Sequence, residues 1–256
     1  MKLSATGLRV LVTAGAAGIG RVIAQTFLDH GARVHVCDVD RTALAQLPEA
    51  ITHSRADVAD LRDVERLFED VQRHLGGLDV LVNNAGIAGP TAKVEDIRPE
   101  DWDRCIAVDL NGMFYCTRKA MPLIKASGGG SIINLSSTAG RLGFPLRSPY
   151  AAAKWAVVGF TKTLAAEAGP DKVRVNCIQP GMVEGERLDR IIAAKAQASG
   201  TAAEEVRAKM LATTSLRSTM TAQDVADMAL YLATEPGRHI TGQAISICAD
   251  LRYYPD

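Results

Sequence analysis

The sequence has no excess of either charge and no cluster of basic residues. Its 256 residues include 29 Lys and Arg and 29 Asp and Glu, which gives a formal net charge of zero, and basic residues nowhere form a run of five. Because a nucleic-acid-binding surface needs clustered positive charge, we expect no nucleic-acid partner. A small-molecule ligand is the alternative that this composition favours.

The sequence also lacks a long hydrophobic run. No apolar stretch approaches the roughly 18 residues that a membrane-spanning helix needs. The opening residues MKLSATGLRVLVTAG lack the apolar core and the cleavage site of a secretory signal. We therefore expect a cytoplasmic protein with no membrane partner.

Cysteine and histidine are too sparse and too scattered for a metal site or a disulfide framework. Neither the five cysteines nor the five histidines form a C-x-x-C or a paired metal-ligand spacing. We expect no metal, no histidine catalysis and mostly buried thiols. The cysteines are Cys37, Cys105, Cys116, Cys177 and Cys248.

Short apolar runs alternate with amphipathic stretches along the whole chain. Six runs rich in Val, Ile and Leu predict strands, and a weaker strand is expected at 53–58. The six are LRVLVTAG, ARVHVCDV, LDVLVNNAG, GSIINLSS, VRVNCIQPG and AISICAD. Helices are expected at 18–30, 101–126, 148–168 and 222–233, and apolar residues from Val64 to Leu75 repeat at helical spacing.

This alternation predicts an α/β fold, a doubly wound parallel sheet of about seven strands with helices on both faces, Rossmann-like in class. No internal repeat or Pro/Ser-rich linker interrupts it, so we expect one domain over 1–256. The charged stretch 184–215 breaks the alternation between the last two strands. We expect it to form a substrate lid.

A glycine-rich turn follows the first expected strand and opens the first helix. It runs from Thr13 to Gly20 and includes Gly15, Gly18 and Ile19. Glycines in this setting let the backbone approach a pyrophosphate at a helix N-terminus, although a purely structural turn could use the same residues.

Asp38 narrows the choice of ligand. It stands eighteen residues after Gly20 at the end of the second expected strand. A carboxylate there accepts hydrogen bonds from the adenosine ribose hydroxyls and repels a 2′-phosphate, so NAD is predicted rather than NADP. Asp40, two residues later, is expected to cap a helix instead.

Tyr150 and Lys154 are four residues apart on an expected helix, so their side chains share one face. An ammonium group beside a phenol favours the phenolate, which makes the pair a usable acid/base. A core ring with a solvated amine is the alternative for such a pair. Ser137 precedes the tyrosine by thirteen residues.

Taken together, these motifs resemble the short-chain dehydrogenase/reductase family over nearly the whole chain. The matching segments occur in the family's order. They are the glycine turn, Asp57-Val58, Asn83-Asn84-Ala85-Gly86, Asn111, Ser137, Tyr150 with Lys154, and Pro180-Gly181.

The resemblance implies a role for each matched residue. Tyr150 would be the acid/base, Ser137 would bond the substrate oxygen, and Lys154 would also grip the nicotinamide ribose. Asn111 would support a water relay beside Lys154. Asp57 and Val58 would border the adenine, and the remaining cofactor contacts would come from Asn84, Ala85, Gly86, Pro180, Gly181 and Val183.

Two positions depart from the family pattern. Ala14 stands where a glycine is usual in the phosphate turn, and Gly185 stands where a threonine often contacts the nicotinamide amide. Both departures put the corresponding cofactor contact in doubt.

The predicted function is hydride transfer between NAD and a small polar secondary alcohol or its ketone, with a sugar, polyol or hydroxy acid favoured. The charged residues Arg141, Arg147, Glu184 and Arg187 near the expected site mouth favour a polar substrate, unless the arginines only face solvent. The rivals are a ketoacyl-thioester reductase and a non-catalytic dinucleotide sensor. The resemblance also implies a homotetramer, and the tail 251–255 either reaches a neighbouring subunit or folds on its own.

Overall fold

The fold is built on one seven-stranded sheet in which every neighbouring pair of strands is parallel. The computed structural model describes residues 3–253, apart from the side chains of Arg187, Ala194, Ala198 and Ser199. The strands are β1 (Arg9–Thr13), β2 (Arg33–Asp38), β3 (Ile51–Arg55), β4 (Val80–Asn83), β5 (Gly130–Leu135), β6 (Val173–Pro180) and β7 (Ala244–Ile247). Their order is β3-β2-β1-β4-β5-β6-β7, so the chain reverses its direction of winding between β1 and β4. Ligands of such sheets bind at the carboxyl edge beside this reversal.

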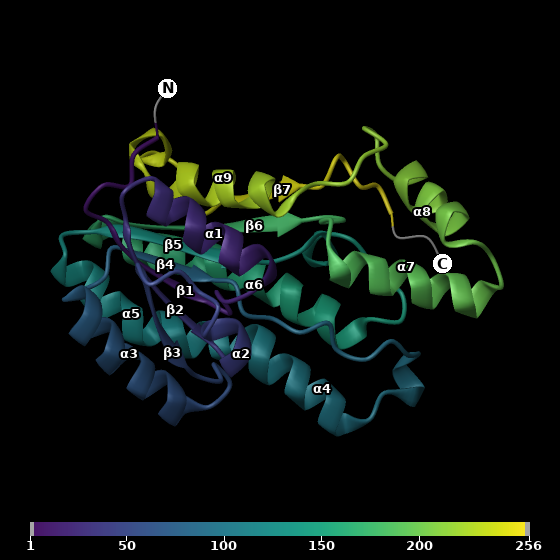
Figure 1. Cartoon of the computed structure of the whole chain (residues 1–256), viewed down its shortest axis with the longest axis horizontal. Coiled ribbons are helices and arrows are strands. Elements are labelled where there is room, and N and C mark those ends of the chain that lie inside the picture. The colour runs from purple at the N-terminus through teal and green to yellow at the C-terminus, as the bar shows by residue number, and fades with distance from the viewer. Residues whose placement is uncertain (1–2, 254–256) are drawn as a thin grey trace.

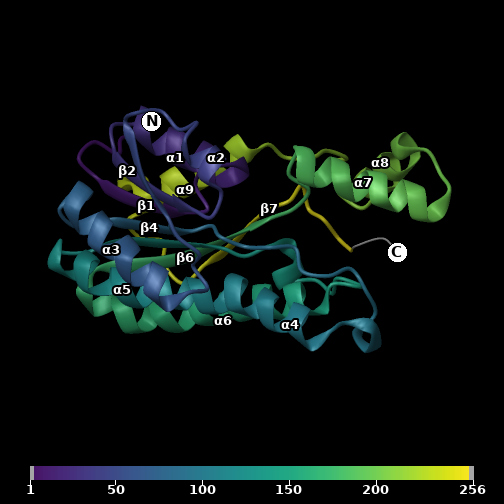
Figure 2. The same cartoon turned by 60° about the horizontal axis from the view of Figure 1, so that its bottom comes forward.

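Helices cover both faces of the sheet, as expected (Figure 1). One face is covered by α1 (Gly18–Asp29) and α9 (Ala222–Ala233), which lie side by side in both views (Figure 2). The other face is covered by α3 (Leu61–Leu75), α5 (Gly112–Ala126) and α6 (Ser148–Ala168). Strands between these layers are apolar on both faces; Val10, Leu11 and Val12 of β1 are fully buried. The predicted fold class is confirmed.

The expected third strand is shifted by two to three residues. It was predicted at 53–58, but β3 spans Ile51–Arg55 and pairs with β2 so that Ile51 lies opposite Val34. Ile51 is buried and starts the strand, whereas the chain leaves the sheet after Arg55. Asp57 then forms a turn in which its carboxylate accepts the amide of Ala59 at 3.0 Å.

The expected helix at 101–126 is interrupted. It consists of α4 (Pro99–Ile106) and α5, joined by a π-helical turn at Ala107–Asn111. The turn buries Asp109 and leaves Asn111 exposed. Because π-helical turns often occur at functional sites, this segment bears directly on the candidate active site.

Two further helices, α7 (Glu186–Ser199) and α8 (Ala203–Ala212), project beyond the carboxyl ends of the strands (Figure 1). They share a small core of their own, made by Leu188, Ile192 and Val206 with Met182 and Leu251. They cover the stretch predicted as a lid. A short helix, α2 (Arg41–Leu44), follows β2. Within the described part of the chain, no helix has the length and apolarity to cross a lipid bilayer.

Candidate active site

The turn after β1 is fastened to the end of β4 by Asn84. The Asn84 side-chain amide donates to the carbonyl oxygens of Thr13 and Ala14, both at 3.0 Å. The backbone amides of Asn84 and Ala85 donate to the Thr13 hydroxyl, also at 3.0 Å. These bonds hold Ala14 at a left-handed φ of 49°. The turn therefore tolerates the methyl group of Ala14, at the cost of an unfavourable backbone conformation.

Helix α1 begins where the turn ends and leaves its first amides open. Its N-cap residue, Ala17, makes no side-chain capping bond, and its first turn contains no acidic residue. A Cβ atom at Gly20 would overlap the Ala14 carbonyl oxygen and lie 2.5 Å from Asn84 Nδ2. Only glycine allows the helix to approach the turn this closely. An uncapped helix N-terminus behind a tight glycine turn fits a dinucleotide pyrophosphate.

The Asp38 carboxylate stands beside this turn at the end of β2. Its two oxygens accept the backbone amides of Ala16 and Asp40, each at 3.2 Å. Asp40 caps α2 through the amides of Thr42 and Ala43, as predicted. Asp38 is thus held at the position where a ribose would lie if the turn holds the pyrophosphate.

Two other predicted cofactor residues, Asp57 and Val58, follow β3. The Asp57 carboxylate bonds Arg104 of α4 at 2.8 Å as well as the Ala59 amide. Val58 is buried against Gly112, the first residue of α5. Ile19 is partly buried and packs with the core beneath α1.

Ser137 and Tyr150 come to the carboxyl edge from β5 and α6. Ser137 follows β5, is buried, and starts the short 3-10 turn Thr138–Gly140 by accepting the Ala139 amide at 3.1 Å. The neighbouring Ser136 hydroxyl donates instead to the Lys154 backbone carbonyl at 2.8 Å. Tyr150 lies in the first turn of α6 and is partly exposed.

Lys154 is buried one turn after Tyr150, with only 4% of its surface exposed. Its ammonium lies 5.5 Å from the centroid of the Tyr150 ring and donates to the Leu135 carbonyl at 3.1 Å. Lys154 is therefore not a solvated amine, which was the alternative to a functional pair with Tyr150. The structure brings Ser137, Tyr150 and Lys154 to one edge of the sheet.

Asn111 does not join them. It is exposed at the end of the π-helical turn, and Asp109 takes the place beside Lys154, with Oδ2 at 3.3 Å from the ammonium nitrogen. The physical reason is helical geometry: residues two apart along a helix point in nearly opposite directions, so Asn111 faces solvent when Asp109 faces α6. A signal was present in the sequence: Asp109 follows Cys105 and precedes Met113 at helical spacing, and both neighbours are buried.

The segment after β6 forms the other wall. Gly181 packs against Cys248, and Val183 pairs with Met220 in an isolated bridge. Gly185 has a φ of 129°, which residues with side chains rarely adopt. The threonine that the family often has here would be strained, so any hold on a nicotinamide amide must come from other groups.

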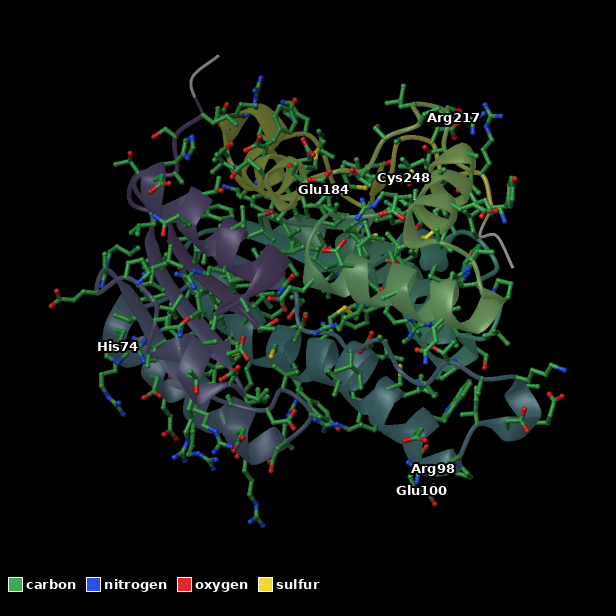
Figure 3. The ribbon with its side chains drawn as sticks, turned by 45° about the vertical axis from the view of Figure 1, so that its right-hand side comes forward. His74, Arg98, Glu100, Glu184, Arg217 and Cys248 are labelled. Carbon is green, nitrogen blue, oxygen red and sulfur yellow. The ribbon has the colours of Figure 1, made fainter. Side chains whose placement is uncertain are left out.

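Of the charged residues expected at the mouth of the site, Arg141, Arg147 and Glu184 bond protein groups. Arg141 donates to the Leu251 carbonyl at 2.7 Å, and Arg147 donates to the Ala88 carbonyl at 2.8 Å. Glu184 accepts the Thr219 hydroxyl at 2.5 Å and lies just before α7 begins (Figure 3). The side chain of Arg187 is outside the described residues. The two arginines thus brace loops, and their positions give no support to an anion site.

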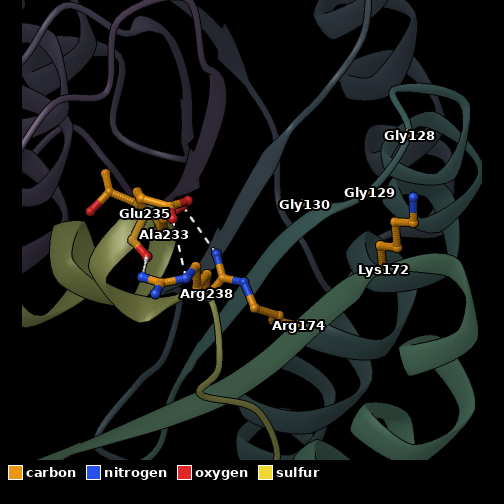
Figure 4. Close-up of a pocket in the computed structure, with 9 residues that line it drawn as sticks. Gly128, Gly129, Gly130, Lys172, Arg174, Ala233, Glu235 and Arg238 are labelled. Atoms are coloured by element: carbon orange, nitrogen blue, oxygen red, sulfur yellow. Dashed lines mark hydrogen bonds and ion pairs between the residues drawn. The ribbon is translucent and has the colours of Figure 1, made fainter.

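A separate basic hollow lies at the opposite edge of the sheet, at the start of β5 and β6. It has a volume of about 280 Å³, and Lys172, Arg174 and Arg238 line it (Figure 4). Arg174 donates to the carbonyl oxygens of Ala233, at the end of α9, and of Gly237, and Arg238 pairs with Glu235. Arg174 and Arg238 are already engaged, and the hollow lies at the edge of the sheet opposite Tyr150 and Lys154, so it is not the candidate active site.

The five thiols are buried, as predicted, and do not compete for the chemistry. Burial raises the pKa of Cys37, next to Asp38, to about 12, and that of Cys177 to about 11. Both therefore stay neutral and unreactive near pH 7.

Comparison with known proteins agrees with this geometry. The model of a family described as enoyl-(acyl carrier protein) reductase matches residues 14–249. A D-beta-hydroxybutyrate dehydrogenase of Rhizobium meliloti is 35% identical over 247 residues, which cover 93% of this chain and 95% of the relative. A probable galactose dehydrogenase, GalD, of the same organism is 35% identical and covers 93% of this chain and 92% of its own length. A 3-oxoacyl-(acyl-carrier-protein) reductase, FabG, of Thermotoga maritima is 33% identical, with coverage of 93% and 94%.

Proposed function

Because the chain belongs to the short-chain dehydrogenase/reductase family, we propose that it is an NAD-dependent oxidoreductase acting on a small polar secondary alcohol or its ketone. The observation that carries this proposal is the buried Lys154 ammonium 5.5 Å from the Tyr150 ring, on the same sheet edge as Ser137. A sensor that had lost catalysis would have no need to keep this set together.

Each of these residues has a distinct task in the proposed reaction. Ser137 Oγ holds the substrate oxygen by a hydrogen bond, and the Tyr150 phenolate takes the hydroxyl proton as the alcohol is oxidised. The Lys154 ammonium stabilises that phenolate and binds the nicotinamide ribose. The chemistry supplied by bound NAD is acceptance of the hydride at the nicotinamide ring.

The residues that would hold NAD lie at the carboxyl edge. The open amides of α1 after Gly18 suit the pyrophosphate, and the Asp38 carboxylate suits the adenosine ribose. The end of β4, from Asn84 to Gly86, and the segment Pro180, Gly181 and Val183 would flank the nicotinamide half. Asp57 and Val58 would border the adenine.

Support for a polar substrate comes from the relatives. Two of them are named for hydroxybutyrate and galactose, a hydroxy acid and a sugar. Sugars, polyols and hydroxy acids are therefore the substrate classes that we propose, with 184–215 acting as the lid over them. Because the Thermotoga relative is named as a 3-oxoacyl-(acyl-carrier-protein) reductase, our second candidate function is reduction of a ketoacyl thioester.

The test is a screen for NAD-linked oxidation across polyols, sugars, hydroxy acids, cyclic alcohols and hydroxyacyl thioesters, with Tyr150→Phe as the matched inactive control. We expect turnover with a polar alcohol that the Phe variant lacks. A preference for a thioester with NADP would favour the second candidate. Turnover with no compound, while NAD still binds, would favour the sensor.

We also propose one domain over 1–256, a cytoplasmic location and a homotetramer. The long helices α5 and α6 expose Phe114 (45%) and Trp155 (51%), which suits burial against another subunit. The described part of the tail supports both arrangements, since Leu251 is buried and Tyr253 is exposed; Tyr254 and Pro255 lie outside the described residues. Light scattering of Trp155→Glu should give a smaller assembly than the parent protein.

A further inference from the structure

A buried carboxylate lies against the lysine of the candidate active site. Asp109 has 1% of its surface exposed, and its Oδ2 atom is 3.3 Å from Lys154 Nζ. Its other oxygen, Oδ1, accepts the Ile87 amide at 2.7 Å. Among the described residues, Oδ2 has no hydrogen-bond partner, so the ammonium is the group that balances it.

Burying a carboxylate is expensive unless a charge or a set of hydrogen bonds compensates for it. A single backbone amide does not replace the lost hydration of both oxygens. Asp109 therefore depends on Lys154, and removing either partner would leave an unbalanced charge in the interior. A neutral side chain of the same shape could have bonded Ile87 without this dependence.

The surrounding backbone is shaped to admit this pair. Asp109 lies in the π-helical turn Ala107–Asn111 and faces Lys154 of α6. Across from it, a Cβ atom at Gly86 would lie 3.1 Å from Lys154 Nζ and 3.3 Å from Asp109 Oδ2. Glycine at the end of the β4 segment thus leaves the space in which the two charged groups meet.

In the described part of the chain, groups from α6, β5 and the segment after β4 face the pair. From α6 itself, Tyr150 faces the ammonium; from β5, Leu135 contributes its carbonyl oxygen; from the segment after β4, Ile87 contributes its amide. Tyr150 is thus the ionisable group on which the charges of Asp109 and Lys154 both act.

We propose that Asp109 is a positioning residue that holds the Lys154 ammonium and offsets part of its charge, so that Tyr150 loses its proton at a higher pH than beside an unpaired lysine. This inference rests on the proposed function, in which the Tyr150 phenolate accepts the alcohol proton. The Asp109 carboxylate would then set the pH at which alcohol oxidation begins. The Asp109–Lys154 pair would also hold the ammonium where it can bind the ribose.

The test compares Asp109→Asn with Asp103→Asn, which makes the same chemical change on the exposed face of α4. In Asp109→Asn, the acid limb of the oxidation rate should move to lower pH by roughly one unit, as expected for one charge at several ångströms in a partly polar interior. The Asp103 variant should follow the parent profile. Asp109→Ser, which is also neutral and smaller, should shift in the same direction if the Asn variant does not fold.

A second readout does not require turnover. Phenolate absorbance near 295 nm, taken as the difference between each protein and its Tyr150→Phe counterpart without cofactor, should titrate at lower pH in both neutral variants. Profiles that coincide with the parent, or that shift to higher pH, would overturn the inference, and so would a loss of thermal stability with an unchanged titration. If the parent protein turns over no alcohol but the titration shifts as expected, the proposed function fails while the charge coupling stands.

Discussion

The Asp38 carboxylate accepts the backbone amide of Ala16 at 3.2 Å, which ties the end of β2 to the glycine turn after β1. The carboxylate is therefore held in place before any nucleotide arrives. A fixed negative charge at this point favours ribose hydroxyls and opposes a 2′-phosphate. Cofactor choice thus depends on one side chain whose position is set by the turn that would bind the pyrophosphate.

We predict that NAD is preferred to NADP by about a hundredfold in kcat/KM, equivalent to about 2.7 kcal/mol. Asp38→Ala should narrow this ratio, mainly by improving the use of NADP, because the repulsion is removed. Asp40→Ala is the control: it removes the cap of α2 and should lower stability by about 1 kcal/mol without changing the ratio. Equal use of both cofactors by the parent enzyme would contradict the assignment.

Tyr150→Phe should lower kcat by about 10² to 10⁴ while NAD affinity stays nearly constant, because only the proton-transferring oxygen is removed. Lys154→Ala should lower kcat and also weaken NAD binding. It should destabilise the fold as well, since Asp109 would lose its buried partner. Steady-state kinetics, NAD titration and thermal unfolding separate these effects. A loss below about tenfold in Tyr150→Phe would rule the tyrosine out as the acid/base.

Gly20→Ala and Gly159→Ala should have opposite effects. A Cβ at Gly20 overlaps the Ala14 carbonyl oxygen, so the turn must shift; we expect a loss of about 1–3 kcal/mol in unfolding free energy and weaker NAD binding. Gly159 is exposed in α6, and a Cβ there meets open space. Alanine at 159 should stabilise the protein by about 0.5–1 kcal/mol and leave NAD binding unchanged. Denaturant unfolding and NAD titration of both variants test this.

His35 should make stability depend on pH in the mildly acidic range. It is fully buried on β2, within hydrogen-bond distance of Thr52 Oγ1 (2.8 Å) and Ser54 Oγ (2.9 Å). Burial, with a smaller contribution from the charge of His74, lowers the pKa of His35 from 6.5 to about 4. Between about pH 4 and pH 6.5, His35 is therefore protonated in the unfolded chain but neutral in the folded chain.

Protonation of His35 therefore favours the unfolded chain, so acid lowers the free energy of unfolding. Stability from neutral His35 is present above pH 6.5 and is lost as the pH falls toward 4, by up to about 3 kcal/mol. His35→Gln should flatten this part of the curve of unfolding free energy against pH, whereas His239→Gln, at an exposed position, should not. An unchanged slope in His35→Gln would show that other groups cause the acid sensitivity.

The fold class followed from the sequence because it depends on patterns that repeat along the chain. Apolar runs such as Val10 to Val12 are typical of strands buried on both faces, as in a parallel sheet. The third strand was misplaced because His53, Ser54 and Arg55 are polar, and only pairing with β2 decides where the strand starts. The four-residue spacing of Tyr150 and Lys154 likewise predicted that their side chains lie on the same face of a helix, since four residues make about one helical turn.

The sequence by itself determined which residues have the chemistry for a dinucleotide and a proton: the glycine turn, Asp38, Ser137, Tyr150 and Lys154. Each depends on local spacing or on the end of a strand. Only the tertiary structure decided that Asp109, rather than Asn111, meets Lys154, because α6 must first pack against the helical segment that carries Asp109. It also decided that Arg141 and Arg147 bond carbonyls of loops distant in the sequence, since the partners of a long side chain depend on which segments the fold brings within its reach.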